Sequence, residues 1–150
     1  MCNLNEETIN SLIVQVCRAH RTRAHSLFSA FGLHVGQEMI LFALFEEDGQ
    51  TLSGLAEKLS LQPPTVTRMA RRMGKSGLLT RRNCADDGRV FRLHLTDKGH
   101  KVKEKLDAAW QQLEVETTQG LSKAQQADLH ELLTTVRDSL QHPHLTASKP

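Results

Sequence analysis

The adjacent prolines Pro63 and Pro64 are the feature that most constrains how this chain can fold. Proline has no backbone N–H, so an α-helix accepts it only in the first turn, where that donor would have no partner. The pair therefore predicts a helix that opens at the prolines and continues over Thr65–Lys75. Gly77 is its expected cap, because glycine readily adopts the left-handed conformation common after a helix.

A second short helix is predicted directly before the prolines. Ser53 has the side chain of a good N-cap for it. About three residues separate the two helices, which is typical of a helix-turn-helix. The apolar residues expected to face inward are Leu55, Ala56 and Leu59.

A β-hairpin is predicted next. Residues 89–95 alternate in polarity, as a strand with one buried face does, and residues 78–83 form its partner. Asp86-Asp87-Gly88 supplies the turn between them. The two faces of the second strand are Phe91, Leu93 and Leu95 on one side and Val90, Arg92 and His94 on the other.

Amphipathic helices flank this unit on both sides. Apolar residues recur at steps of three and four over residues 6–31, and a nearly all-apolar helix is expected over residues 35–47. Thr96 is the expected cap of one long helix after the hairpin. Ser122 and Gln125 have the spacing of a capping box for a last helix.

These elements predict a mainly α, single-domain protein of residues 1–150: a winged helix-turn-helix with about six helices and a β-hairpin wing. The winged-helix part is expected at about residues 34–96. The flanking helices carry more apolar surface than a winged helix of about 60 residues can cover. The helices at about 6–31 and 97–141 are therefore expected to be buried in a twofold homodimer.

The charge is concentrated in one window. The net charge is only +2, but residues 63–92 hold eight Lys or Arg and two Asp, so the rest of the chain is negative overall. Such a stretch indicates contact with a polyanion, and its alternative is a solvated charged face. Seven of the eight cations are Arg, which favours recognition of phosphates and base edges.

The helix opened by the prolines offers a surface that reads DNA. The second helix of such a motif enters the major groove and presents its N-terminal residues to the bases. Arg72 either contacts DNA as well or forms an internal ion pair. Backbone N–H groups at the Ser53 end of the preceding helix suit a phosphate. The residues expected at the bases are Pro64, Thr65, Thr67, Arg68 and Arg71.

The hairpin tip carries Arg89, which suits the strongly negative potential of a narrow minor groove. Arg81, Arg82 and Arg92 either contact DNA or only tune the field around the wing. An Arg-rich face of this kind could instead meet an acidic protein partner, and that remains the alternative interpretation of the winged helix.

Several short motifs occur in a characteristic order: Asp48–Ser53, Thr65–Arg68, Arg72-Met73, Gly77–Leu79, Asp87–Arg89 and Leu95–Gly99. Together they resemble the MarR family of bacterial transcriptional regulators. The resemblance implies homodimers joined by their first and last helices and bound to pseudo-palindromic duplex DNA, usually as repressors. It places Arg89 in the minor groove with Asp87 bracing it, and we assign Arg82 to support of the wing as well.

Many members of that family release DNA when a small aromatic acid or other anion binds between the dimer helices and the winged helix, and some respond to oxidation or zinc. Arg18, His20 and Arg21 are the candidates here for an effector pocket, or they complement acidic groups across the dimer. The chain departs from the family in having His34 where Thr is common.

Two cysteines are candidates for redox sensing. Cys17 lies on the apolar stripe of the first helix, so a buried thiol is expected there. It lies nearer to Gly32 than the cysteine of the peroxide-sensing branch does, and the chain has no Tyr partner. Cys84 lies beside the wing turn, where an oxidised adduct would disturb docking.

Other functions find little support in the residues. No Cys/His set has zinc spacing, and no motif of an enzyme or of a cofactor site occurs, so neither metal nor cofactor is expected. The longest apolar run, Met39–Phe45, is far shorter than the ~20 residues of a spanning helix. With no signal pattern and an odd number of cysteines, a cytoplasmic protein is expected.

The assignment of Arg89 to the wing tip is testable. Arg89→Ala is expected to weaken binding at the ends of a mapped operator, because the minor-groove contact is lost there. Footprinting and anisotropy titration of both proteins on that operator measure it. Equal affinity and an equal footprint would contradict the role of the wing.

Overall fold

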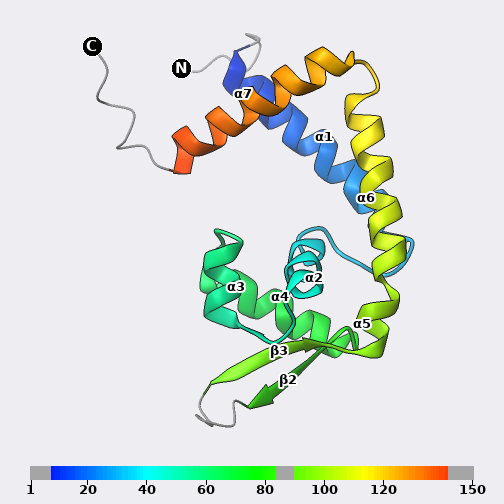
Figure 1. Cartoon of the computed structure of the whole chain (residues 1–150), viewed down its shortest axis with the longest axis vertical. Coiled ribbons are helices and arrows are strands. Elements are labelled where there is room, and N and C mark those ends of the chain that lie inside the picture. Colours follow the sequence, from blue (N-terminus) through cyan, green and yellow to red (C-terminus); the bar gives the residue numbers. More distant parts are fainter. Residues whose placement is uncertain (1–7, 84–89, 142–150) are drawn as a thin grey trace. The chain divides into compact units, whose positions relative to one another are not determined.

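The computed structural model describes residues 8–83 and 90–141, and the chain divides into two compact units, residues 1–113 and 114–150 (Figure 1). The helices are α1 (Ile9–Ser29), α2 (Gln37–Glu46), α3 (Leu52–Lys58), α4 (Pro63–Lys75), α5 (Asp97–Lys101), α6 (Lys103–Thr118) and α7 (Lys123–Gln141). The strands are β1 (Gln50–Thr51), β2 (Leu79–Asn83) and β3 (Phe91–Leu95). None of the described helices is long and apolar enough to cross a membrane.

The sheet is antiparallel, with strand order β1-β3-β2. The antiparallel pairing of the two predicted strands is confirmed, and its register pairs Leu79 with Leu95 and Asn83 with Phe91, whereas the predicted turn Asp86-Asp87-Gly88 lies outside the described residues. Strand β1 was not predicted, because two residues give no periodicity and its existence depends on pairing with β3. The predicted alternation holds for Leu93 and Leu95, which are buried, whereas Phe91 is 37% exposed.

The first unit is built around α2. This helix buries four of its apolar side chains, as its all-apolar run predicts. The buried face of α4, with Val66, Ala70 and Met73, belongs to the same core as Leu93 of the sheet. The most deeply buried side chains of this core include Phe28, Ile40, Leu41, Leu44, Leu55, Val66, Met73, Leu93 and Leu106. The core therefore fixes α4 relative to the wing strands.

The ends of α4 are those that the sequence predicts. Pro63 and Pro64 occupy its first turn, and Gln62 is the N-cap. Gly77 follows the helix at φ +76°, a left-handed conformation that glycine adopts without strain.

The predicted cap of α3 is wrong by two residues. Thr51, not Ser53, is the N-cap, and its Oγ1 accepts from the backbone N–H of Gly54 at 3.0 Å. Thr51 is also the last residue of β1, so pairing with β3 holds its backbone extended and α3 begins at Leu52. Ser53 lies exposed within the first turn of the helix.

The single long helix predicted after the hairpin is also wrong. Thr96 is the N-cap, as expected, but α5 ends at Lys101, and α6 begins after Val102. The Thr96 hydroxyl lies within hydrogen-bond distance of the carbonyl oxygens of Gly77 and Leu78. A Cβ at Gly99 would collide with the Leu78 carbonyl oxygen, so α5 lies tightly against this turn. Val102 is buried and breaks the helix for one residue.

The second unit contains the end of α6 and all of α7. The predicted capping box is confirmed: Ser122 Oγ accepts from Gln125 N at 3.2 Å, and Gln125 Oε1 accepts from Ser122 N at 2.9 Å. No residue of α7 is buried. Leu132, Leu133 and Leu140 are 64%, 55% and 73% exposed, so one chain leaves the apolar stripe of α7 uncovered.

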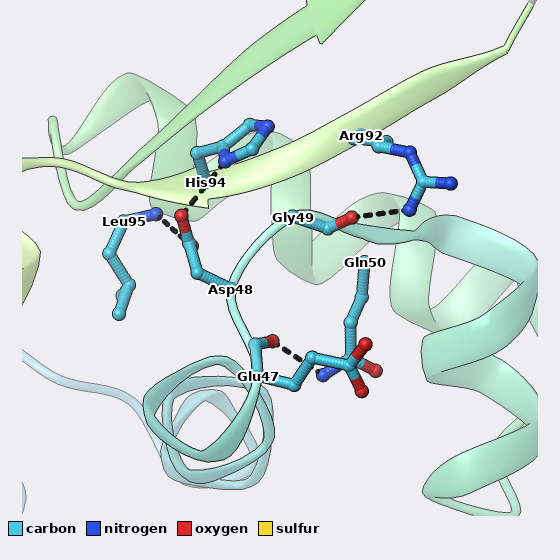
Figure 2. Close-up of polar contacts among 7 residues, drawn as sticks. All are labelled: Glu47, Asp48, Gly49, Gln50, Arg92, His94 and Leu95. Atoms are coloured by element: carbon cyan, nitrogen blue, oxygen red, sulfur yellow. Dashed lines mark hydrogen bonds and ion pairs between the residues drawn. The ribbon is translucent and has the colours of Figure 1, made fainter. Parts of the chain in front are cut away.

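Asp48 joins the turn after α2 to strand β3 (Figure 2). Its two carboxylate oxygens accept from Leu95 N and lie beside His94 Nδ1, each at 2.8 Å. Arg92 Nη1 donates to the carbonyl oxygen of Gly49 at 2.7 Å. Gly49 has φ +77°, and a Cβ there would lie 2.8 Å from the His94 ring. The predicted end of α2 at Asp48-Gly49 is thus also the anchor of the wing.

Burial acts to raise the pKa of Asp48, but the N–H of Leu95 and then the hydrogen bond and charge of His94 lower it. The net effect holds the pKa below its ordinary value. A carboxylate of this kind stabilises the fold above its unfolded-state pKa, and the contribution is lost as the pH falls through the folded-state pKa.

Asp48→Ala is expected to lower the free energy of unfolding at neutral pH by about 1 kcal/mol, because the Leu95 N–H loses its acceptor at a partly solvated site. The difference in the free energy of unfolding from wild type should begin to shrink at about pH 4, the unfolded-state pKa, and should be lost as the pH falls through the lower folded-state pKa. Urea unfolding across this range measures it, with Asp48→Asn as the control that keeps an acceptor oxygen. A difference independent of pH would contradict the role of the charge.

Candidate nucleic-acid interface

Helix α4 presents a cationic face opposite its buried one. Arg68, Arg71, Arg72 and Lys75 are exposed, as are Pro64 and Thr67, whereas Thr65 is half-buried. Among residues 8–83 and 90–141, no carboxylate lies within ion-pair distance of these four cations. An internal ion pair of Arg72, the alternative to DNA contact, is therefore not seen in the described part of the chain. This face holds uncompensated positive charge that suits a polyanion.

The hydroxyl proton of Thr67 is already used in a hydrogen bond within α4. Its Oγ1 donates to the carbonyl oxygen of Pro63 at 2.9 Å. The lone pairs of that oxygen remain as acceptors, so Thr67 suits a base-edge amino group better than a phosphate oxygen.

Two grooves flank α4, one on each side. The groove on the wing side has a volume of about 450 Å³ and includes Arg71, and the groove on the α1–α2 side has about 410 Å³ and includes Arg72. These neighbouring arginines therefore lie on different flanks of one helix. The second groove is lined by Arg21, Thr22, His25, His34, Val35 and Arg72.

The wing strands carry further cations. Arg82 and Arg92 are direct cross-strand partners, and like charges at such positions repel each other. The hydrogen bond from Arg92 to the Gly49 carbonyl oxygen directs the Arg92 guanidinium away from Arg82. The Arg81 guanidinium lies over the Phe91 ring, 4.3 Å from its centroid. Arg89, Asp87 and Cys84 lie outside the described residues, so their predicted roles stay predictions.

The proposed effector residues separate in the structure. Arg21 lines the groove beside Arg72, whereas Arg18 lines a shallow surface on α1 alone, and His20 lines neither. Glu38 lies buried near Arg21, and its Oε2 accepts from Gly36 N at 2.6 Å. Burial raises the pKa of Glu38 against the opposing effects of backbone N–H groups and of the charges of Arg21 and His20.

The expectation of a buried Cys17 thiol is wrong, because Cys17 is exposed. The apolar stripe of the N-terminal half of α1 is itself uncovered, with Ile9 74% and Val16 60% exposed. The amphipathic spacing therefore predicted the apolar face of α1 correctly, but it did not predict that this face is exposed in a single chain. In the described part of the chain, no group of three His, Cys, Asp or Glu residues could hold a metal ion.

A sequence model of the MarR family matches residues 33–91. The organic hydroperoxide resistance transcriptional regulator of Bacillus subtilis is 33% identical over 109 residues, which are 72% of this chain and 70% of that protein. The chain belongs to the MarR family. The HTH-type transcriptional regulator TtmR of Methylorubrum extorquens is 31% identical over 114 residues, 71% of this chain, and this chain spans only 58% of that protein.

Solved structures agree with the MarR fold. The PcaV regulator of Streptomyces coelicolor, in complex with its natural ligand, matches with a TM-score of 0.82 and 25% identity over 93% of this chain and 98% of its own. A mutant MarR from E. coli complexed with operator DNA matches with a TM-score of 0.79 and 25% identity over 85% and 92%. The protein is a winged helix-turn-helix transcriptional regulator, and the alternative of a protein-interaction module gains no support.

Sequence reasoning missed several residues of the two grooves. Lys75 lies on the same face of α4 as Arg68 and Arg71, which helical spacing alone could have shown. His25 and His34 come from different elements, and no local pattern brings them together.

Arg68→Ala is expected to weaken operator binding by about 1–3 kcal/mol and to relax the preference at one base pair, because Arg pairs bidentately with guanine. Arg72→Ala is the matched control: it removes the same charge from the same helix, on the flank facing α1 and α2. Anisotropy titration on operator duplexes with single base changes measures both. Equal losses for the two variants on every sequence would make Arg68 a nonspecific phosphate contact.

Proposed function

We propose that this MarR-family protein is a homodimeric repressor that binds pseudo-palindromic duplex DNA and is released by a small anionic or aromatic effector. The observation that carries the proposal is the cationic face of α4, whose Arg68, Arg71 and Lys75 have no carboxylate partner among the described residues. A helix with this face fits the major groove, and its arginines match guanine edges and phosphates.

In this proposal, Arg68 with Pro64 and Thr67 reads bases, while Arg71 and Lys75 neutralise phosphates. Thr65 and Ser53 lie at the N-terminal turns of α4 and α3, where hydroxyl and backbone N–H groups suit a phosphate. Arg89 enters the minor groove, braced by Asp87 and supported by Arg82.

The dimer is supported by apolar surface that one chain leaves bare. It includes Leu132, Leu133 and Leu140 on α7 and Ile9, Leu12 and Val16 on α1. Exposed apolar stripes on terminal helices gain burial from a second copy, and twofold symmetry would place the two α4 helices about 34–36 Å apart, one turn of duplex.

The effector site is supported by the groove between α1, the α1–α2 connection and α4. Arg21, His25, His34 and Arg72 line it and offer positive charge or N–H donors to an anion. Because Arg72 belongs to α4, an anion bound there acts directly on the DNA-reading helix. The solved PcaV relative binds a natural ligand, which supports a ligand-responsive protein.

A redox-responsive regulator is the second candidate. Cys17 is an exposed thiol on α1, and a relative is named an organic hydroperoxide resistance regulator. Oxidation of such a thiol to a sulfenic acid or an adduct would change the surface of α1.

Selection from a random duplex pool tests the proposal, followed by anisotropy titration of the enriched duplex across salt concentrations. The expected result is a twofold site with half-sites about one turn apart and a steep fall of affinity with salt.

Benzoate and an organic hydroperoxide, added separately to the protein–duplex complex, distinguish release by an anion from release by oxidation, with Arg21→Ala and Cys17→Ser as the matching variants. Absence of any enriched duplex would overturn the proposal.

Leu133→Glu is expected to give monomers and to lose operator affinity, because a charge enters the apolar stripe of α7. Ala127→Glu introduces the same charge at an exposed position on the opposite side of α7 and should leave a dimer. Sedimentation equilibrium measures both. A dimeric Leu133→Glu protein with unchanged affinity would contradict a dimer interface at α7.

A further inference from the structure

The groove between α4 and strand β2 has an apolar floor and a cationic rim. The floor contains Ala70, Leu79 and Leu93, and the rim carries Arg71, Lys75 and Arg81. No acidic residue is among those that line it. Its volume is about 450 Å³, and every lining residue belongs to the first unit of the chain.

Arg81 is held in place at this rim by an aromatic ring. Its guanidinium lies 4.3 Å from the centroid of Phe91, the geometry of a cation–π contact. Arg81 is opposite Leu93 in the register, so Phe91 is its diagonal neighbour across the two strands. The ring lies where the buried face of β3 reaches solvent, at 37% exposure. The guanidinium therefore covers an exposed apolar surface while its N–H groups stay available.

Arg81 has no carboxylate partner within the described residues. A stacked arginine keeps its in-plane donors free, and these match the oxygens of a phosphate. Fixing the side chain before binding also reduces the rotamer entropy that is lost when the contact forms.

The geometry of duplex DNA indicates which anion would lie in this groove: a backbone phosphate. When a helix lies in the major groove and a wing in the adjacent minor groove, the sugar–phosphate strand that separates the two grooves passes between helix and wing. We infer that the α4–β2 groove seats this strand, that Arg81 bonds one of its phosphates, and that Phe91 is a positioning residue for Arg81. The apolar floor accepts deoxyribose, while the rim neutralises phosphate. The inference rests on the proposed function.

The first test compares Arg81→Ala with Lys105→Ala on the duplex selected by the wild-type protein. Lys105 is an exposed cation on α6, away from the groove, so its loss changes the net charge equally. Arg81→Ala is expected to weaken binding about tenfold and to reduce the slope of log affinity on log salt by about one per half-site. Equal effects of the two variants would overturn the inference.

The second test separates the positioning of Arg81 by Phe91 from the positive charge of Arg81. Phe91→Leu keeps the net charge and an apolar side chain but removes the ring. It is expected to weaken binding several-fold, and to add nothing in the Arg81→Ala background, because both changes then remove one contact. A loss of the same size in both backgrounds would show that Phe91 acts without Arg81.

Single neutral methylphosphonates, placed in turn along each half-site, locate the phosphate. At one position between the major-groove and minor-groove contacts, the substitution should weaken wild-type binding but leave Arg81→Ala unaffected. Absence of such a position overturns the inference alone. Absence of duplex binding by the wild-type protein defeats the proposed function instead, so the two failures are distinguishable.

Discussion

The wing of this protein depends on one carboxylate. Asp48 bonds two consecutive residues of β3 from the turn that ends α2, and Arg92 bonds back to the same turn. The α2 helix is buried in the core that also holds α4. Through these three bonds, strand β3 is tied to the same core that holds α4, the helix proposed to read DNA.

Local sequence signals were reliable where the physical cause was local. The two prolines fixed the start of α4, and the Ser122–Gln125 capping box fixed the start of α7. The candidate cationic face followed from helical spacing for the same reason.

The errors share a different cause, which is contact between distant residues. The N-cap of α3 is Thr51 and not Ser53 because β1 pairs with β3, and the predicted long helix is interrupted at the buried Val102, after a short α5 that lies against Leu78. Cys17 lies on a stripe that one chain leaves uncovered. Likewise, the groove around Arg72 joins three elements whose approach no short window of sequence encodes.

Helix α7 has a consequence for stability. With no residue buried, it contributes little apolar burial to the fold of a single chain. In the proposed dimer, association supplies that burial, and the free energy of unfolding then includes a term in protein concentration. Thermal midpoints of this regulator would rise with concentration, and a cell that makes few copies would hold a less stable protein as well as a less occupied operator.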